Sequence, residues 1–338
     1  MNVKLAKLNK ILKARLKDYQ FRIRFYGFAF ATWDLLWWFC FYVRPSFSWW
    51  LSTCAIQHKT AWLDRYIEKK YSAIIDRYKS DSAPNKSNVS SQTIWFFWGQ
   101  GSAEMPILVK ACYKQLTELN ENVILVTTKN LENYLNLPKV IYDKVENGII
   151  SWAHFSDIIR TSLLAKYGGL WLDATVWITR EFPFNKFENY SFYSANGLVR
   201  KSNRSIRFWT SFQWNWSTWC MYASYPNTTL FSFVSTMLQA FAIQEDYWPD
   251  YVFQDYLIYY ACRNFPQVRT AMVECNKINF NNRNRLAELM NTPYNDNEYK
   301  KLTASDYIFK LSFRSHWEPQ TSAGHSTYFG KLIYSKIR

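Results

Sequence analysis

The chain has 338 residues, a net charge of +15 at pH 7 and an aromatic content of 20%, so it is long enough for one catalytic domain with a large core plus an appended region. Residues 1–80 carry 15 Lys and Arg against 5 Asp and Glu, whereas the rest is close to balanced. This asymmetry argues against a nucleic-acid-binding enzyme core and indicates an anionic surface, such as a membrane leaflet, near the N-terminus. The six cysteines form no CxxC pair, which excludes a zinc signature of that type and predicts no disulfide framework.

The N-terminal segment predicts two helices of different character. Residues 4–24 place Leu and Ile at helical spacing among Lys and Arg, which is typical of a basic amphipathic helix. Residues 25–43 are almost continuously apolar and just reach the roughly 20 residues that span a bilayer. Asp34 in their middle would cost about 2.5–3.5 kcal/mol there, so we expect a helix lying in or dipping into the cytoplasmic leaflet. The alternatives are a true span and a hydrophobic helix packed on the catalytic domain.

A third amphipathic helix is predicted over residues 60–79, and a polar Ser- and Asn-rich segment follows it. That segment is the best domain boundary in the chain. We therefore expect a helical, membrane-associating region (1–80), a linker (81–92) and a catalytic domain (93–338).

The catalytic domain begins with alternating strands and helices. Buried strands are predicted at 93–99 and 123–128, and helices at 105–119, at about 129–135 and within 138–146. This order predicts an α/β fold with a mostly parallel central sheet, whose ligands bind beyond the carboxyl ends of the strands.

Residues 154–179 are predicted to form a helix, a glycine break and one continuous strand. Ser156 is a plausible N-cap, with Asp157 in the first turn. Asp157 and Arg160 are neighbours on the helix surface, and Asp173 and Thr175 share one face of the strand. We expect these four side chains to enter one pocket.

These motifs resemble those of a known enzyme family. SDIIR (156–160) followed by YGGLWLDAT (167–175) is similar to the block of glycosyltransferases that bind nucleotide sugars through a DXD motif, and most of all to the bacterial capsular polysaccharide synthesis glycosyltransferases. The resemblance implies the A-type nucleotide-sugar transferase fold, with a nucleotide-sugar half over about 93–180 and an acceptor half over about 181–338.

The resemblance also implies roles for particular residues. It makes Asp157, Arg160 and Asp173 catalytic, and it assigns the donor to Trp98, Gly99, Asp157, Arg160, Gly168, Gly169, Asp173, Thr175 and His316. Trp98 would stack on the nucleotide base, for which plain core packing is the alternative. Asp157 and Arg160 would contact the donor sugar and phosphates, where an ordinary surface ion pair is the alternative.

The metal and acceptor sites are less specified. A DXD motif holds a divalent cation through two carboxylates, but here Thr175 replaces the second acid. Asp173 either binds Mn²⁺ or Mg²⁺, with Thr175 and Glu318 as further candidate ligands, or it binds the sugar hydroxyls directly. Candidate acceptor contacts are Asp250, Asp255 and Trp214, with helix-capping, surface and core roles as alternatives.

We therefore expect a glycosyltransferase that transfers a hexose from a nucleotide sugar, with a uridine diphosphate sugar as the expected donor. The acceptor would be a lipid-linked oligosaccharide of a capsule, exopolysaccharide or O-antigen, and the transfer would retain the anomeric configuration. Residues 1–45 would bind the anionic cytoplasmic face of the bacterial inner membrane, as a peripheral or monotopic protein, and no nucleic acid is expected as a partner. The alternative is a catalytically inactive relative that binds nucleotide sugar or glycan in a capsule assembly complex.

Overall fold

A computed structural model describes residues 2–42, 48–80, 91–195, 216–275 and 282–337 of the chain. At its centre lies a mixed five-stranded sheet in the order β2-β1-β3-β6-β5. Its strands are β1 (Ile94–Phe97), β2 (Val123–Val126), β3 (Gly169–Leu172), β5 (Tyr193–Ser194) and β6 (Cys220–Ala223). β3 and β6 are buried along their whole length, as expected of strands covered on both faces.

The α/β prediction is confirmed, although the sheet is less parallel than expected. β1 pairs in parallel with β2 and β3, whereas β6 runs antiparallel to both β3 and β5. The antiparallel strands arise beyond residue 180, where the sequence shows no clear alternation of strands and helices.

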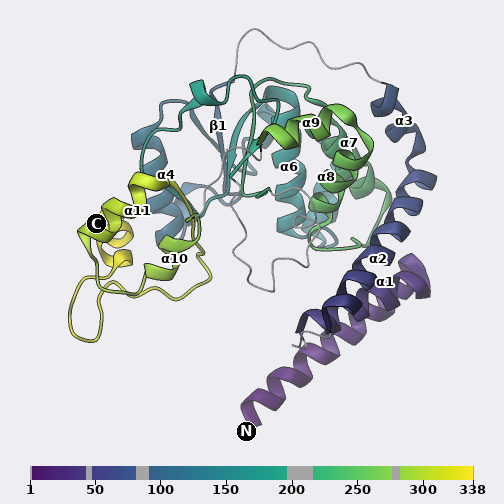
Figure 1. Cartoon of the computed structure of the whole chain (residues 1–338), viewed down its shortest axis with the longest axis horizontal. Coiled ribbons are helices and arrows are strands. Elements are labelled where there is room, and N and C mark those ends of the chain that lie inside the picture. Colours follow the sequence, from purple (N-terminus) through teal and green to yellow (C-terminus); the bar gives the residue numbers. More distant parts are fainter. Residues whose placement is uncertain (1, 43–47, 81–90, 196–215, 276–281, 338) are drawn as a thin grey trace.

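Helices cover both faces of this sheet, with α4 on one side of β1 and α6, α7 and α8 on the other (Figure 1). Pro106 caps α4 in place of a polar side chain, because the missing N–H of proline costs nothing at a helix start. The helices of this body are α4 (Ile107–Leu119), α5 (Lys139–Glu146), α6 (Trp152–Tyr167), α7 (Thr229–Gln244), α8 (Phe253–Asn264) and α9 (Pro266–Cys275), with 3₁₀ turns η1 (Ser102–Glu104), η2 (Leu131–Asn133) and η3 (Phe184–Lys186).

The prediction of one continuous strand over 170–179 is wrong. The chain leaves the central sheet after Leu172, turns at Asp173–Thr175, and continues as β4 (Val176–Ile178) in a second sheet. The Val176 N–H donates to the Asp173 carbonyl across this turn (3.0 Å). β4 then pairs antiparallel with β7 (Ile308–Lys310), which places Val176 opposite Lys310.

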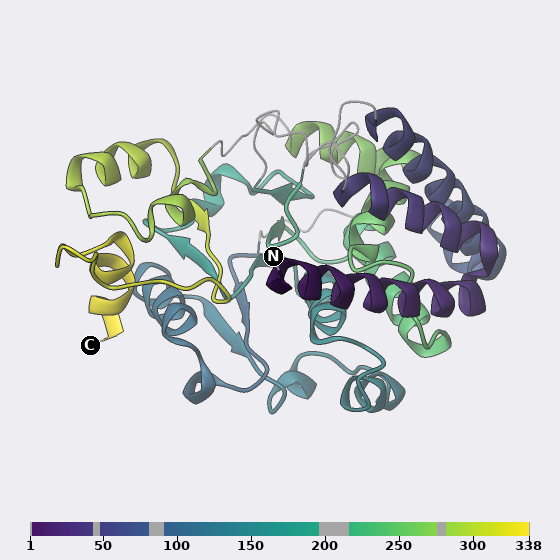
Figure 2. The same cartoon turned by 90° about the horizontal axis from the view of Figure 1, so that it is seen from below.

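The C-terminal segment forms a second, smaller apolar core with α4 and the β4–β7 sheet. It comprises α10 (Arg285–Leu289), α11 (Asp296–Ser305), the π-helical segment η6 (Phe329–Tyr334) and α12 (Ser335–Ile337). Figure 2 shows that this segment and the N-terminal helices lie at opposite ends of the molecule.

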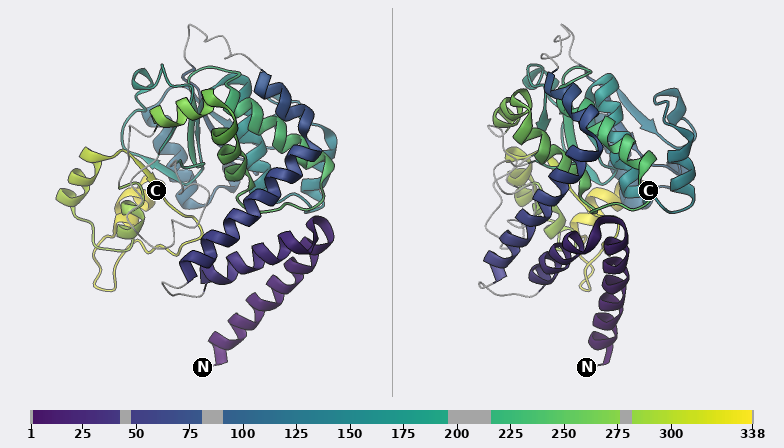
Figure 3. Two further views of the ribbon diagram at one scale, coloured as in Figure 1. Left: turned by 45° about the vertical axis from the view of Figure 1, so that its right-hand side comes forward. Right: turned by 90° about the vertical axis from the view of Figure 1, so that its right-hand side faces the viewer.

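The N-terminal region consists of α1 (Asn2–Tyr42), α2 (Ser48–Lys70) and α3 (Ser72–Ser80). α1 breaks at Gly27, whose φ of 82° is in the left-handed region that glycine tolerates. The two halves of α1 fold back on each other at this point, and α2 packs beside them (Figure 3). Tyr26, Leu63 and Ile75 belong to the same apolar core as the central sheet.

Asp34 is buried in this region rather than facing an apolar surface. Its carboxylate forms ion pairs with Arg15, Arg22 and Lys59. Burial alone would raise its pKa, but the charges of Lys59, Arg22 and Arg15 hold the pKa of Asp34 below its usual value. In the described parts of the chain, no helix combines the length and the apolar character needed to cross a membrane. The predicted linker is outside the described residues over 81–90.

Candidate active site

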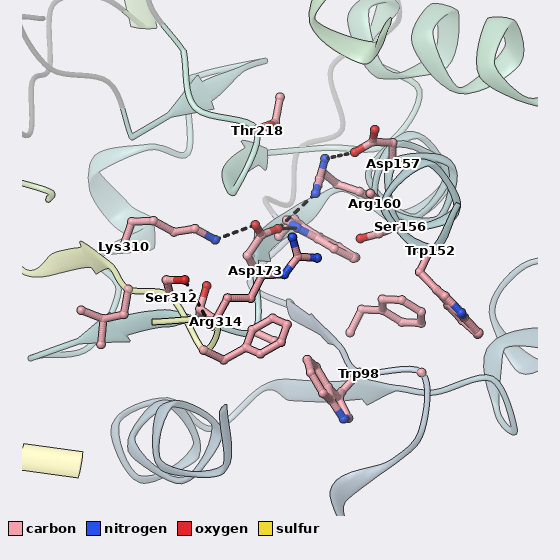
Figure 4. Close-up of a pocket in the computed structure, with 18 of the residues that line it drawn as sticks. Trp98, Trp152, Ser156, Asp157, Arg160, Asp173, Thr218, Lys310, Ser312 and Arg314 are labelled. Carbon is pink, nitrogen blue, oxygen red and sulfur yellow. Dashed lines mark hydrogen bonds and ion pairs between the residues drawn. The ribbon is translucent and has the colours of Figure 1, made fainter. Parts of the chain in front are cut away.

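A pocket of about 650 Å³ opens beyond the carboxyl ends of β1 and β3. Trp98 and Gly99 reach it from the end of β1, and Asp173 reaches it from the end of β3. The helix α6 contributes Asp157 and Arg160 from a third direction (Figure 4). Ligand sites of open α/β sheets occur at this edge, so the pocket is the expected place for substrate.

Helix α6 places Arg160 at the centre of a polar network. The side chain of Ser151 caps this helix by accepting a hydrogen bond from the His154 N–H. The prediction that Ser156 is the N-cap is therefore wrong. The helix therefore starts one turn earlier, and Asp157 lies in its second turn. Arg160 Nη1 donates to Asp157 Oδ1 and to the side-chain oxygen of Gln254, each at 2.7 Å.

Arg160 also reaches across to Asp173, the residue after β3. Its Nη2 donates to Asp173 Oδ1 at 3.1 Å, and the same oxygen accepts from the indole N–H of Trp171 at 2.9 Å. The second oxygen, Oδ2, accepts from Lys310 Nζ at 2.8 Å (Figure 4). Burial pushes the pKa of Asp173 upward, but the charges of Lys310 and Arg160 hold it below its usual range, so this carboxylate stays ionised.

Two other carboxyl groups in the pocket have the opposite property. Burial raises the pKa of Asp157 to about 7, against the opposing charge of Arg160. Burial likewise raises the pKa of Asp255 to about 6, although its carboxylate accepts a hydrogen bond from the Trp216 indole at 2.8 Å. The pocket thus combines one permanently charged carboxylate with two that can gain or lose a proton near neutral pH.

Aromatic rings form the side of the pocket opposite Arg160. The rings of Trp98 and Phe313 meet edge to face with centroids 5.6 Å apart, and Trp98 is only partly buried. Trp152 lines the same side, and Arg314 extends beside Phe313 (Figure 4). This wall offers flat apolar surface next to positive charge, which suits a base joined to phosphates.

Most of the candidate residues lie together. Seven of them line the pocket: Trp98, Gly99, Asp157, Arg160, Asp173, Thr175 and Asp255. Trp214 lies outside the described residues.

Gly168 and Gly169 lie at the opposite end of β3 from Asp173 and do not line the pocket. Their φ angles are 67° and 92°, and a Cβ on Gly169 would lie 2.5 Å from the carbonyl oxygen of Thr93. The described contacts therefore give this glycine pair a packing role at the start of the strand.

Three further candidates make contacts elsewhere. Asp250 pairs with the buried Lys59 of α2, which joins the N-terminal region to the loop before α8. His316 and Glu318 are exposed, pair with each other and do not line the pocket.

The structure also identifies residues of the polar network that the sequence did not suggest. Lys310 and Gln254 both contact the network, from β7 and α8 respectively. Lys310 is 137 residues from Asp173 in the chain, and Gln254 is 94 from Arg160. Neither residue is part of a local motif, so no local pattern could have indicated them.

The described candidate ligands do not fit a divalent cation. Such an ion takes about six oxygen ligands, with several carboxylates or waters among them. Both oxygens of Asp173 already accept from cationic or N–H donors, and Glu318 lies outside the pocket. Among the residues that the structure describes, no group of three or more His, Cys, Asp or Glu is arranged to hold a metal.

Comparison with protein families places the chain in a described family. A family model described as "Capsular polysaccharide synthesis protein" matches residues 51–332, which include every described residue of the pocket. No curated protein matches the chain.

Proposed function

The chain belongs to the capsular polysaccharide synthesis protein family, and we propose that it is a glycosyltransferase that moves a hexose from a nucleoside diphosphate sugar to a lipid-linked oligosaccharide. One observation carries the proposal. A network of Asp157, Arg160, Asp173 and Lys310 faces an aromatic wall across a pocket at the open end of an α/β sheet.

Each part of the donor has a matching surface in this pocket. The exposed part of the Trp98 ring, which packs edge to face against Phe313, suits a nucleotide base, and uracil is the proposed base. Lys310 and Arg314 line the same pocket, with Arg314 beside Phe313, and suit the diphosphate. Asp157 and Arg160 present a carboxyl and a guanidinium that can bind sugar hydroxyls.

The acceptor would approach from the side of Asp255, which lines the pocket together with Thr218 and Tyr251. In the transfer, the bond between the anomeric carbon and the diphosphate oxygen breaks, and a bond from that carbon to the acceptor hydroxyl oxygen forms. The hydroxyl proton passes to the leaving diphosphate, so no strong protein base is needed, and we propose retention of configuration. Catalysis then rests on positioning and on stabilising the charge that develops on the diphosphate.

We propose further that the protein works at the cytoplasmic face of the membrane. The first 80 residues carry a large excess of positive charge, and Phe28, Phe39 and Trp50 expose aromatic side chains on the N-terminal helices. Basic charge beside exposed aromatic rings favours the surface of an anionic bilayer.

Turnover by the purified full-length protein tests the enzymatic proposal. Release of nucleoside diphosphate is measured for a panel of nucleotide sugars with lipid extract as acceptor, once with Mn²⁺ and once with chelator. We expect turnover with at least one donor and a loss of about a hundredfold or more in Asp173→Asn, because this change removes a fixed charge from the network. Asp296→Asn, on the remote and exposed surface of α11, is the matched control.

The rival function, an inactive nucleotide-sugar or glycan binder, predicts the opposite result. In that case every donor fails to turn over in both buffers, while binding of a nucleotide sugar is retained in the wild-type protein. Such an outcome would overturn the enzymatic proposal.

A further inference from the structure

Lys310 takes the place beside Asp173 that a divalent cation would need. Both carboxylate oxygens of Asp173 already accept hydrogen bonds: Oδ2 accepts from Lys310, and Oδ1 accepts from Arg160 and Trp171. We propose that Lys310, with Arg314, neutralises the donor diphosphate in place of a metal ion, and that this site binds its nucleotide without a divalent cation. The inference rests on the proposed function and goes beyond it.

Backbone pairing within the fold fixes where the side chain of Lys310 begins. Lys310 is the last residue of β7, and the register of the β4–β7 pair places it opposite Val176. Its own N–H is also held, by the carbonyl of Arg283 at 2.8 Å. The next residue, Leu311, donates its N–H to the Thr175 carbonyl at 2.9 Å, so the turn that carries Asp173 is joined to the residue that directly follows Lys310.

The supply of carboxylates also argues against a metal. Asp157 and Asp255 are the other acids that line the pocket. Asp157 already accepts a hydrogen bond from Arg160, and Asp255 already accepts one from the Trp216 indole. Thr175 stands where a second acid of a DXD motif would be. Segments 196–215 and 276–281, which the structure does not describe, contain no Asp, Glu, His or Cys in the sequence.

Lys310 and Arg314 are suited to a diphosphate. Lys310 is about a quarter exposed, so its ammonium can reach a ligand while it still contacts Asp173. Arg314 follows four residues later on the same side of the pocket, next to Phe313 and the Trp98 wall. Two cations beside a base-binding surface supply the charge that a bound metal would otherwise bring to the phosphates.

Nucleotide binding by the full-length protein tests the inference. UDP is titrated calorimetrically into metal-free protein, first in chelator and then with added Mn²⁺. GDP and dTDP are titrated in the same way, so that binding is also detected if the site prefers a base other than uracil. We expect one of them to bind with a Kd that changes less than about threefold on addition of Mn²⁺. Lys310→Ala should weaken binding at least about tenfold, because a charged hydrogen bond to phosphate is lost, and Lys310→Arg should keep most of it.

Lys300→Ala is the control, since Lys300 pairs with Asp296 on an exposed helix far from the pocket. A second readout follows from the geometry. Removing the Lys310 ammonium frees Asp173 Oδ2, so Mn²⁺ should improve binding to Lys310→Ala and not to the wild-type protein.

Two results overturn the inference while the proposed function stands: tenfold tighter binding to the wild-type protein on addition of Mn²⁺, or unchanged binding by Lys310→Ala. If none of the three nucleotides binds in either buffer, the proposed donor site itself is wrong and the inference falls with it.

Discussion

Arg160 sets the charge of the pocket at the scale of single residues. It is 5% exposed, and its guanidinium lies 5.1 Å from the centre of the Trp171 ring while it bonds to Asp157, Gln254 and Asp173. Lys310 adds a second cation to Asp173 but none to Asp157. This difference explains why one carboxylate stays ionised while the other can hold a proton at neutral pH.

The raised pKa of Asp157 has a consequence for stability. Its folded-state pKa is about 7, against roughly 3.9 in an unfolded chain. Between these values the folded state binds more protons, so this group lowers the stability of the wild-type protein as pH rises from about 4 to 7. Asp157→Asn stays neutral and avoids this loss.

We therefore expect the free energy of unfolding of Asp157→Asn, minus that of the wild-type protein, to rise by up to about 1.4 kcal/mol per pH unit between pH 5 and 7. Urea denaturation at pH 5, 6, 7 and 8 measures it. Asp296→Asn is the control, because the hydrogen bond from Lys300 lowers the pKa of that exposed carboxyl and leaves it ionised over this range. A difference that stays flat with pH would refute the assigned environment of Asp157.

At the scale of elements, the connection from α6 to β3 brings the site together. The helix ends at Tyr167, two glycines reverse the chain, and the four residues of β3 then deliver Asp173 to the pocket. Gly168 lies against the backbone of Ala223, and Gly169 lies against that of Thr93. The spacing between Arg160 and Asp173 therefore depends on a turn that has no room for a side chain.

Gly169→Ala should destabilise the protein by about 3 kcal/mol or more, since it combines a left-handed backbone angle with a close contact to the Thr93 carbonyl. Gly148→Ala is the matched control, because Gly148 also has a positive φ of 70° but no neighbour within 4 Å of the added Cβ. That variant should lose only about 1 kcal/mol. Denaturant unfolding of both compares them, and equal losses would show that the contact with Thr93 does not matter.

At the scale of the whole molecule, buried charges join the N-terminal helices to the body that carries the pocket. Lys59 is fully buried and bonds to both Asp34 of α1 and Asp250 of the loop before α8. Arg22 donates to the Pro249 carbonyl in the same loop. The next residues, Tyr251 and Val252, line the pocket. Removal of α1 would take Asp34 away from the buried Lys59 and would destabilise the fold. A deletion variant that no longer bound membranes could therefore have lost either its membrane surface or its fold.

Surface substitutions make a cleaner test of the membrane proposal. Phe28 and Phe39 are 11 residues apart, about three helical turns, so they face the same way on α1, and Trp50 is exposed on α2. Replacing all three by Ser should weaken binding to phosphatidylglycerol vesicles by at least about tenfold, because their apolar surface no longer inserts. Binding of the wild-type protein should also fall with added salt.

Sedimentation with vesicles at constant lipid concentration measures this binding. The control replaces Ile107 and Val273 by Ser, since these are also exposed apolar residues but lie on α4 and α9, away from the N-terminal helices. Equal binding by the triple variant, the control and the wild-type protein would contradict the proposed membrane surface.

The sequence by itself determined the parts of this protein that depend on local pattern. Apolar runs of four residues predict β1 and β2, and the glycine pair predicts the passage from α6 to β3. Asp157 and Arg160 are neighbours through helical spacing alone. The fold class and seven of the residues that line the described pocket, Asp157, Arg160 and Asp173 among them, could therefore be predicted from short stretches of chain.

Only the tertiary structure decided how those parts are connected. The two-residue period of 170–179 could not reveal that the chain changes sheets at Asp173, because β4 has the same alternation whichever sheet it joins. Asp34 looked like a charge in an apolar segment until Arg15, Arg22 and Lys59 were placed around it. Lys310 reaches Asp173 solely through the pairing of β4 with β7, across 137 residues of chain, and contacts at that separation follow from packing rather than from any local pattern.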